Sequence, residues 1–164
     1  MKKTIIIGIF TFLLTGHLFC QVQEKDIYEV LNQLIKINNV EILSKKAKAL
    51  SIEDPYKDEF INWCINDGED GIKLSQIDSS LIMKQIHSYD EIKWDKRRMN
   101  KNIKIKKKSV DYFTIPLFLN EDKNIFIVYH RQYAGPLAAQ GTYELYKKVN
   151  NEWKLINVQL VFVS

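Results

Sequence analysis

The sequence predicts an α+β fold in which N-terminal helices pack on a C-terminal antiparallel β-meander. Apolar residues recur at helical spacing in the first part of the chain after residue 20. From residue 102 onward the spacing changes to the alternation typical of strands, and Asn150-Asn151 has the composition of a two-residue hairpin turn. Because the helical part precedes the strand-rich part and does not alternate with it, the order favours α+β over α/β.

Composition is that of a globular protein. The chain has 164 residues, with 24 Lys and Arg against 20 Asp and Glu, and 46% of its residues are hydrophobic. These values exclude a disordered acidic chain, a collagen-like repeat and a disulfide-dense small protein. A net charge of +4 is too small to indicate a nucleic-acid partner.

Residues 1–20 are typical of a secretory signal peptide. Lys2 and Lys3 precede an apolar run over residues 4–14, which polar residues interrupt at 15–17. The run is too short for a transmembrane helix. We expect cleavage after Cys20, a single mature domain over 21–164, and a periplasmic or secreted location. A lipid anchor at Cys20 is the alternative, although the bulky Phe19 before it does not fit such a signal.

Three helices and five strands are expected in the mature chain. The best helix covers 24–38, where the apolar residues fall on one stripe. Two more are expected at about 55–65 and 76–87, and residues 40–50 are ambiguous between helix and strand. The expected strands are 102–108, 112–119, 125–133, 142–149 and 152–163, with 134–141 as an irregular loop.

The Asn150-Asn151 turn fixes a register for the last hairpin. If these two residues form the turn, Tyr146 pairs with Leu155 and Lys148 with Trp153. The same register predicts the pairs Leu145–Ile156 and Tyr143–Val158. It places Leu145, Ile156, Val158, Leu160 and Phe162 on the core face, and Tyr146 and Trp153 on the opposite face.

No catalytic residue, metal ligand set or cofactor is predicted. His87 and His130 are the only histidines after residue 20, and no second ligand stands at zinc-binding spacing from either. The acidic turn over 66–71 lacks the ligand pattern of a calcium loop. Cys64 alone cannot form an internal disulfide and is expected to be buried.

Charge is polarised along the chain. Residues 93–108 contain nine bases and one acid, and residues 51–91 contain ten acids and three bases. The basic stretch is either a patch for an anionic partner or the counterpart of the acidic stretch.

A binding surface is predicted around the segment 134–141, which is uncharged and has a glycine near each end. Tyrosine and tryptophan supply large contact areas with a polar end, and an arginine adds electrostatic steering. The candidate residues are Arg131, Tyr133, Gly135, Gly141, Tyr143, Tyr146 and Trp153.

The C-terminal part resembles a loose class of small, uncharacterised exported bacterial proteins. The resemblance lies in the Pro-containing segment 115–118, the apolar strand 125–133, the glycine-bearing segment 135–141, the Tyr-rich strand 143–146 and the Lys-x-x-x-x-Trp-Lys hairpin 148–154. It implies an exported α+β domain and carries no catalytic signature.

The function expected from these observations is an exported binding module, for instance an inhibitor or immunity-type protein of the cell envelope. One alternative is a cell-wall hydrolase that uses carboxylates such as Glu53, Asp54, Asp58 or Glu59. A carrier with a small-ligand pocket between helices and sheet is the other. We expect a protein or envelope component as partner, and no nucleic acid.

Overall fold

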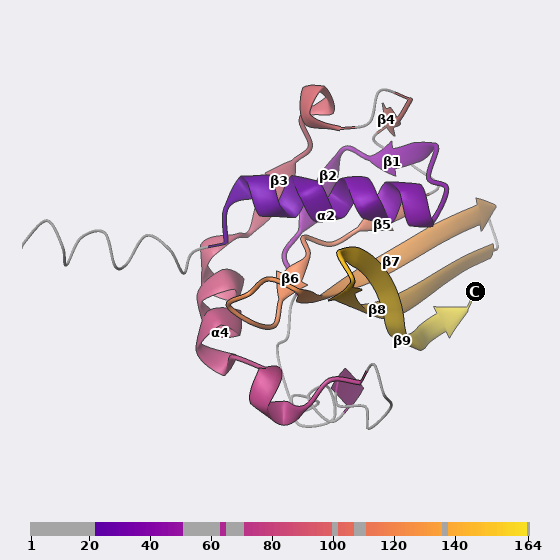
Figure 1. Cartoon of the computed structure of the whole chain (residues 1–164). Coiled ribbons are helices and arrows are strands. Elements are labelled where there is room, and N and C mark those ends of the chain that lie inside the picture. The colour runs from indigo at the N-terminus through magenta and orange to yellow at the C-terminus, as the bar shows by residue number, and fades with distance from the viewer. Residues whose placement is uncertain are drawn as a thin grey trace, which may run out of the picture.

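The computed structural model describes residues 22–50, 63–64, 71–99, 102–106, 111–135 and 138–163. Within them it shows an α+β fold with two α-helices and a mixed seven-stranded sheet that ends in the antiparallel strands β7, β8 and β9 (Figure 1). The elements are α2 (Glu24–Ile37), β1 (Ile42–Ser44), β2 (Lys46–Lys48), α4 (Ser79–Ser88), β3 (Glu91–Lys93), β4 (Lys104–Lys106), β5 (Asp111–Phe113), β6 (Leu117–Phe118), β7 (Ile125–Gly135), β8 (Ala138–Val149) and β9 (Glu152–Val163), with short 3₁₀ helices at Leu74–Gln76 and Lys96–Arg98.

Helix α2 confirms the predicted helix over 24–38. Its N-terminus is capped because the Asp26 carboxylate accepts the N–H of Gln23 at 2.9 Å. The chain leaves the helix through Asn38 and through Asn39, whose φ of 51° ends the helical geometry. The apolar stripe is buried throughout: Ile27, Val30, Leu31, Leu34 and Ile35.

Helix α4 begins at Ser79 because Asp78 caps it. The Asp78 carboxylate accepts the N–H groups of Ser80 and Leu81 at 2.9 and 3.0 Å, and these bonds lower the pKa of Asp78. The predicted helix over 76–87 is therefore correct but begins three residues later. Of the helix predicted at 55–65, only residues 63 and 64 are described, and both are helical.

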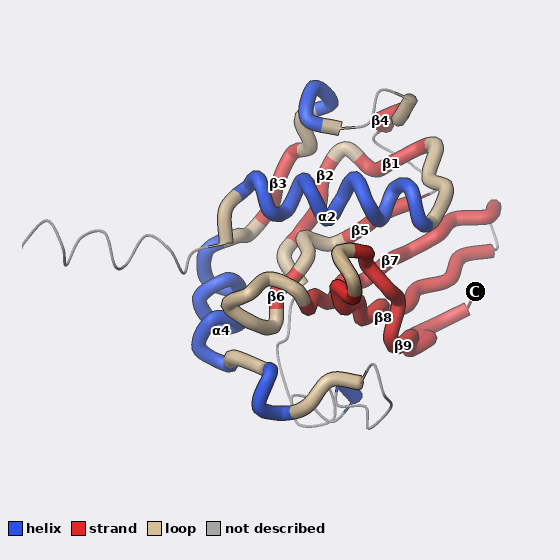
Figure 2. Tube along the Cα trace, in the orientation of Figure 1, coloured by secondary structure: helices blue, strands red, loops and turns tan. Residues whose placement is uncertain are grey.

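The sheet is mixed, so the prediction of a simple meander was incomplete. Its strand order is β4-β1-β5-β7-β8-β9, and β6 also pairs with β7 (Figure 2). Strand β1 runs parallel to both β4 and β5, whereas the pairs from β5 to β9 are antiparallel. The ambiguous segment 40–50 supplies β1 and β2, and β2 pairs separately with β3.

Each face of the sheet carries its own core. On the face toward α2, here called the α2 face, Phe113, Phe126 and Tyr146 join the stripe of that helix. On the opposite face, here called the α4 face, the buried strand residues pack with Cys64, Ile72 and residues of α4: Leu117, Ile125, Ile127 and Leu145. The N-terminal part of β7 and the C-terminal part of β8 are thus covered on both faces of the sheet, which buries both Leu145 and Tyr146. The prediction that Tyr146 faces solvent was wrong for this reason.

The hairpin between β8 and β9 confirms the predicted turn and half of the predicted register. Asn150 and Asn151 adopt φ values of 51° and 66°, as a type I′ turn requires. The pairs Lys148–Trp153 and Tyr146–Leu155 are present.

Beyond Leu155 the register shifts. Ile156 is an extra residue in β9, so Leu145 pairs with Asn157, and Tyr143 with Gln159. A second irregularity leaves Val161 without a pair between Leu160 and Phe162. The predicted pairs Leu145–Ile156 and Tyr143–Val158 were therefore wrong. The placement of Val158 and Leu160 in the core was wrong as well. The first bulge moves both residues to the α2 face, where Val158 is 47% exposed and Leu160 is 56% exposed.

The predicted loop over 134–141 is largely sheet. Strand β7 continues to Gly135, β8 begins at Ala138, and these two residues pair. Only 136–137 separate the strands, and they lie outside the described residues.

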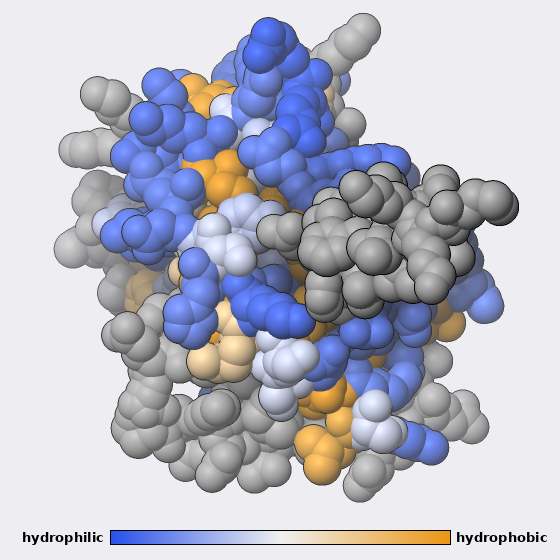
Figure 3. All heavy atoms as spheres, turned by 90° about the vertical axis from the view of Figure 1, so that its left-hand side faces the viewer, coloured by the Kyte–Doolittle hydropathy of each residue, from blue (hydrophilic) through white to orange (hydrophobic). Residues whose placement is uncertain are grey.

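The surface over α4 and the start of α2 is largely hydrophilic, with hydrophobic residues in small separate patches (Figure 3). In the part of the chain that the structure describes, no helix is long and apolar enough to cross a membrane.

Candidate functional site

A histidine between two carboxylates lies buried on the α2 face. His130 of β7 contacts Glu144 of β8 through Nδ1 (2.9 Å to Oε1) and Asp111 of β5 through Nε2 (3.1 Å to Oδ1). Its ring stacks on Phe113 with 4.1 Å between centroids. The Tyr146 hydroxyl donates to the other oxygen of Glu144 at 2.8 Å. Three strands thus meet in one polar cluster inside an apolar core.

The two carboxylates decide the charge of the ring. Burial by itself lowers the pKa of His130, but the hydrogen bonds and charges of Asp111 and Glu144 outweigh burial, so the pKa is raised. Burial, followed by the charge of Glu144 and the bond to it, raises the pKa of Tyr146 as well, so its hydroxyl stays protonated and donates. The two carboxylates therefore favour the protonated form of the ring, in which each nitrogen can donate to one of them.

This cluster is closed to a substrate. The side chain of His130 is 3% exposed, and those of Asp111 and Glu144 are 9% exposed. We assign it a structural role, which is to join β5, β7 and β8. The sequence did not identify Asp111 and Glu144 as partners of His130, because neither carboxylate stands at a recognisable spacing from it.

Four of the seven predicted site residues lie on the α4 face, where the C-terminal end of β7 pairs with the N-terminal end of β8. They are Arg131, Tyr133, Gly141 and Tyr143, and the strand pairing brings Tyr112 and Tyr129 beside them. Arg131 lies over the Tyr112 ring at 5.3 Å, and the rings of Tyr129 and Tyr143 are 5.5 Å apart. We call Tyr112, Tyr129, Arg131, Tyr133 and Tyr143 the tyrosine surface.

Exposure of the α4 face increases along β7. Ile125 and Ile127 are fully buried, Tyr129 is half-buried, and Tyr133 is 46% exposed. The tyrosine surface therefore begins where the core of α4 ends.

Gly141 shapes this surface by letting aromatic rings approach the backbone. A Cβ at this position would lie 2.3 Å from the Tyr129 hydroxyl and 2.6 Å from a ring carbon of Phe162. At Gly141, two rings of the chain itself occupy the space that a side chain would take. At Gly135 nothing lies within 4 Å of such an atom.

Tyr146 and Trp153 lie on the other side of the sheet. Tyr146 is 1% exposed and stacks on Phe126, while Trp153 meets Phe126 edge-on. The seven candidates therefore do not form one surface.

Trp153 instead lines a groove of about 190 Å³ between α2 and the β8–β9 turn. Four of its five charged residues form ion pairs: Lys123 with Asp26 (2.5 Å) and Lys148 with Glu29 (3.5 Å). The volume is below the roughly 300 Å³ at which ligand pockets begin.

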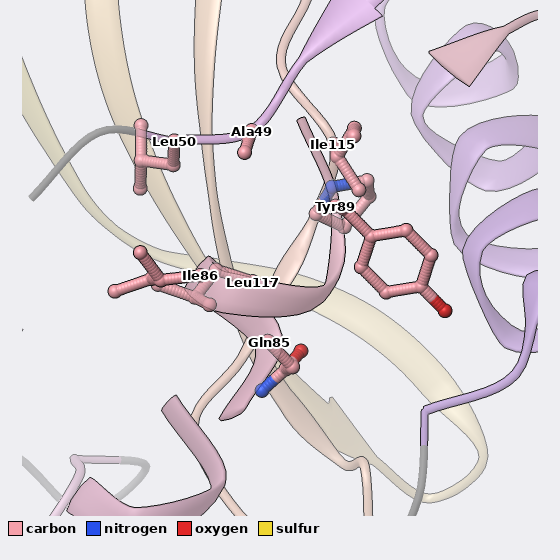
Figure 4. A pocket seen from close by; sticks show the side chains of 8 residues that line it. Ala49, Leu50, Gln85, Ile86, Tyr89, Ile115 and Leu117 are labelled. Atoms are coloured by element: carbon pink, nitrogen blue, oxygen red, sulfur yellow. The ribbon is translucent and has the colours of Figure 1, made fainter. Parts of the chain in front are cut away.

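A second hollow lies between α4 and the segment leading into β6 (Figure 4). It has space of about 10 Å³, enough for about one water. Gln85 closes it by donating to the Phe118 carbonyl at 2.7 Å and accepting the Phe118 N–H at 3.0 Å. Neither hollow supports the small-ligand carrier.

The remaining candidate features give mixed results. Cys64 is buried as predicted, and burial raises the pKa of its thiol to about 12. In the basic stretch, Arg98 pairs with Glu24 of α2 and Arg97 with its neighbour Asp95. The carboxylates proposed for a hydrolase (Glu53, Asp54, Asp58 and Glu59) and the acidic turn at 66–70 lie outside the described residues. Among the residues that the structure describes, no group of three or more His, Cys, Asp or Glu side chains could hold a metal ion.

Searches against protein-family models, curated proteins and solved structures found no match to this chain.

Proposed function

We propose that this chain is an exported binding module that recognises a partner protein through the tyrosine surface. The observation that carries the proposal is the side-by-side arrangement of four tyrosines and one arginine where the α4 face emerges from its core. Tyrosine and arginine are the residue types that dominate binding energy in protein interfaces.

The surface suits recognition because its parts are already ordered. Stacking fixes Arg131 over Tyr112, and Tyr129 is held between Tyr143 and Gly141. Side chains that are ordered before binding lose little conformational entropy when a partner docks. The most exposed ring, Tyr133, stands beyond these supports and supplies free contact area.

A protein partner fits this surface better than a small molecule. The rings line a strand face, and neither of the two hollows described above includes them, so this face suits a partner of matching area. We propose an inhibitor or immunity-type protein of the cell envelope as the kind of module that this surface would serve. The signal peptide predicted over 1–20 supports an envelope or extracellular location for the chain.

Site-specific photo-cross-linking in the native host tests this function. A photoreactive phenylalanine analogue replaces Tyr133. In the control it replaces Leu74, which is 62% exposed and belongs to the 3₁₀ helix Leu74–Gln76, outside the strands that carry the tyrosine surface. We expect one discrete cross-linked species at position 133 and none at 74. Equal or absent cross-linking at both positions would overturn the proposal.

A further inference from the structure

Strand β9 carries an unusual row of exposed apolar side chains. Five of the nine exposed large hydrophobic residues in the described part of the chain lie on this one strand: Leu155, Val158, Leu160, Val161 and Val163. The strand is also the last in the sheet order, so one of its backbone edges has no neighbouring strand among the described residues. Long apolar edge strands pair readily with another strand.

The two bulges place four of these side chains on one face. Residues paired across strands share a face, and Leu155, Val158, Leu160 and Val163 pair with Tyr146, Glu144, Thr142 and Gln140. All four partners alternate along the α2 face of β8. In a regular strand without these bulges, alternation would place Leu155 and Val163 on one face and Val158 and Leu160 on the other.

The row is symmetric about Gln159. Val158 and Leu160 stand one residue from it on either side, and Leu155 and Val163 stand four residues from it. An antiparallel copy of the strand, related by a two-fold axis at Gln159, would therefore set Val158 opposite Leu160 and Leu155 opposite Val163. A two-fold interface requires this kind of self-complementary surface.

Charge does not oppose this pairing. The stretch from Leu155 to Val163 contains no charged residue, so no like charges would meet across the axis. Edge strands that remain unpaired usually carry lysine or proline as protection, and this stretch has neither.

We propose that β9 pairs with β9 of a second copy of this chain about a two-fold axis at Gln159, which joins the two sheets into one. This inference is independent of the tyrosine surface, which lies on the opposite face.

Disulfide trapping tests the register directly. Residues facing each other across an antiparallel pair have Cα atoms about 4.5–5.5 Å apart, which suits a disulfide. In a chain carrying Cys20→Ser, where buried Cys64 is the remaining native thiol, Gln159→Cys should give a covalent dimer on mild oxidation. Leu155→Cys alone should not, because its partner position is 163, whereas the double variant with Val163→Cys should.

Sedimentation equilibrium supplies the second measurement. We expect a dimer for the parent chain. For Val158→Lys we expect a dimer dissociation constant at least ~10-fold higher, because this change places two like charges near the axis. Leu74→Lys, at an exposed position elsewhere, should leave the dimer intact. A monomeric parent chain, or equal trapping of Gln159→Cys and Leu155→Cys, would overturn the proposal.

Discussion

His130 Nδ1 lies 2.9 Å from Glu144 Oε1, although the two residues are 14 positions apart on neighbouring strands. In the β7–β8 register His130 pairs with Thr142, so Glu144 is its diagonal neighbour on the α2 face. Asp111 approaches the same ring from β5 on the other side. The contact therefore joins three strands through one side chain, and it makes the sheet sensitive to the protonation of that side chain.

Stability should fall as pH rises through the pKa of His130. The folded protein raises this pKa above the unfolded value of about 6.5, so the stabilisation is complete below that pH and is lost above the folded pKa. Urea unfolding between pH 5.5 and 9 measures it, with His130→Gln as the reference for all other groups. A difference between the two proteins that grows with pH would contradict the assignment.

Removing one partner of the buried cluster should be costly. Glu144→Ala leaves the buried His130 ring with one carboxylate partner and the Tyr146 hydroxyl without its acceptor, which we expect to cost about 3–5 kcal/mol. Glu29→Ala is the matched control, because its ion pair with Lys148 is on the surface and should contribute less than about 1 kcal/mol. Similar unfolding free energies for the two variants would show that the cluster does not support the sheet.

Gly141→Ala should destabilise the protein because two rings occupy the space of the new methyl group. The closest atom is the Tyr129 hydroxyl, and Phe162 lies next. We expect a loss of about 1–3 kcal/mol in denaturant melts, the usual cost of overpacking. Tyr129→Phe removes the closest atom, so the same change should cost less in that background. An equal cost in both backgrounds would mean that the Tyr129 hydroxyl is not the obstacle.

The last hairpin should lose far more stability from Tyr146→Ala than from Leu160→Ala. Tyr146 is buried between Phe126 and the Glu144 carboxylate, so its truncation should cost about 3–5 kcal/mol. Leu160 is 56% exposed, and its truncation should cost about 0.5 kcal/mol or less in dilute protein. The reverse order would restore the face assignment that the sequence alone suggests.

Sequence reasoning succeeded where a local pattern decides the structure. The stripe of α2 has helical spacing, and the positive φ values of Asn150 and Asn151 follow from the tolerance of asparagine for that conformation. It failed where distant segments decide. The extra residue Ile156 leaves no mark in the alternation of β9, and the burial of Tyr146 depends on α2, more than 100 residues away.

The candidate site was predicted in part for the same reason. Arg131, Tyr133 and Tyr143 share a face because their strands pair over a long regular stretch. Trp153 lies on the opposite face. Tyr112 was missed because only the pairing of β5 with β7 brings it beside Arg131, and Tyr129 was missed because the pairing of β7 with β8 sets it opposite Tyr143. Asp111 and Glu144 were missed as partners of His130 in the same way.

The central claim is that the tyrosine surface binds a protein, and the affinity of the cross-linked partner for two matched variants tests it most directly. Tyr133→Ala removes an exposed ring of the surface, and Met83→Ala removes a side chain of similar exposure, 43%, on α4. Both proteins should melt like the parent chain. We predict that Tyr133→Ala raises the Kd by at least ~10-fold, as loss of a hot-spot tyrosine does, and that Met83→Ala leaves it unchanged. An unchanged Kd for Tyr133→Ala, measured on a folded protein, would contradict the account.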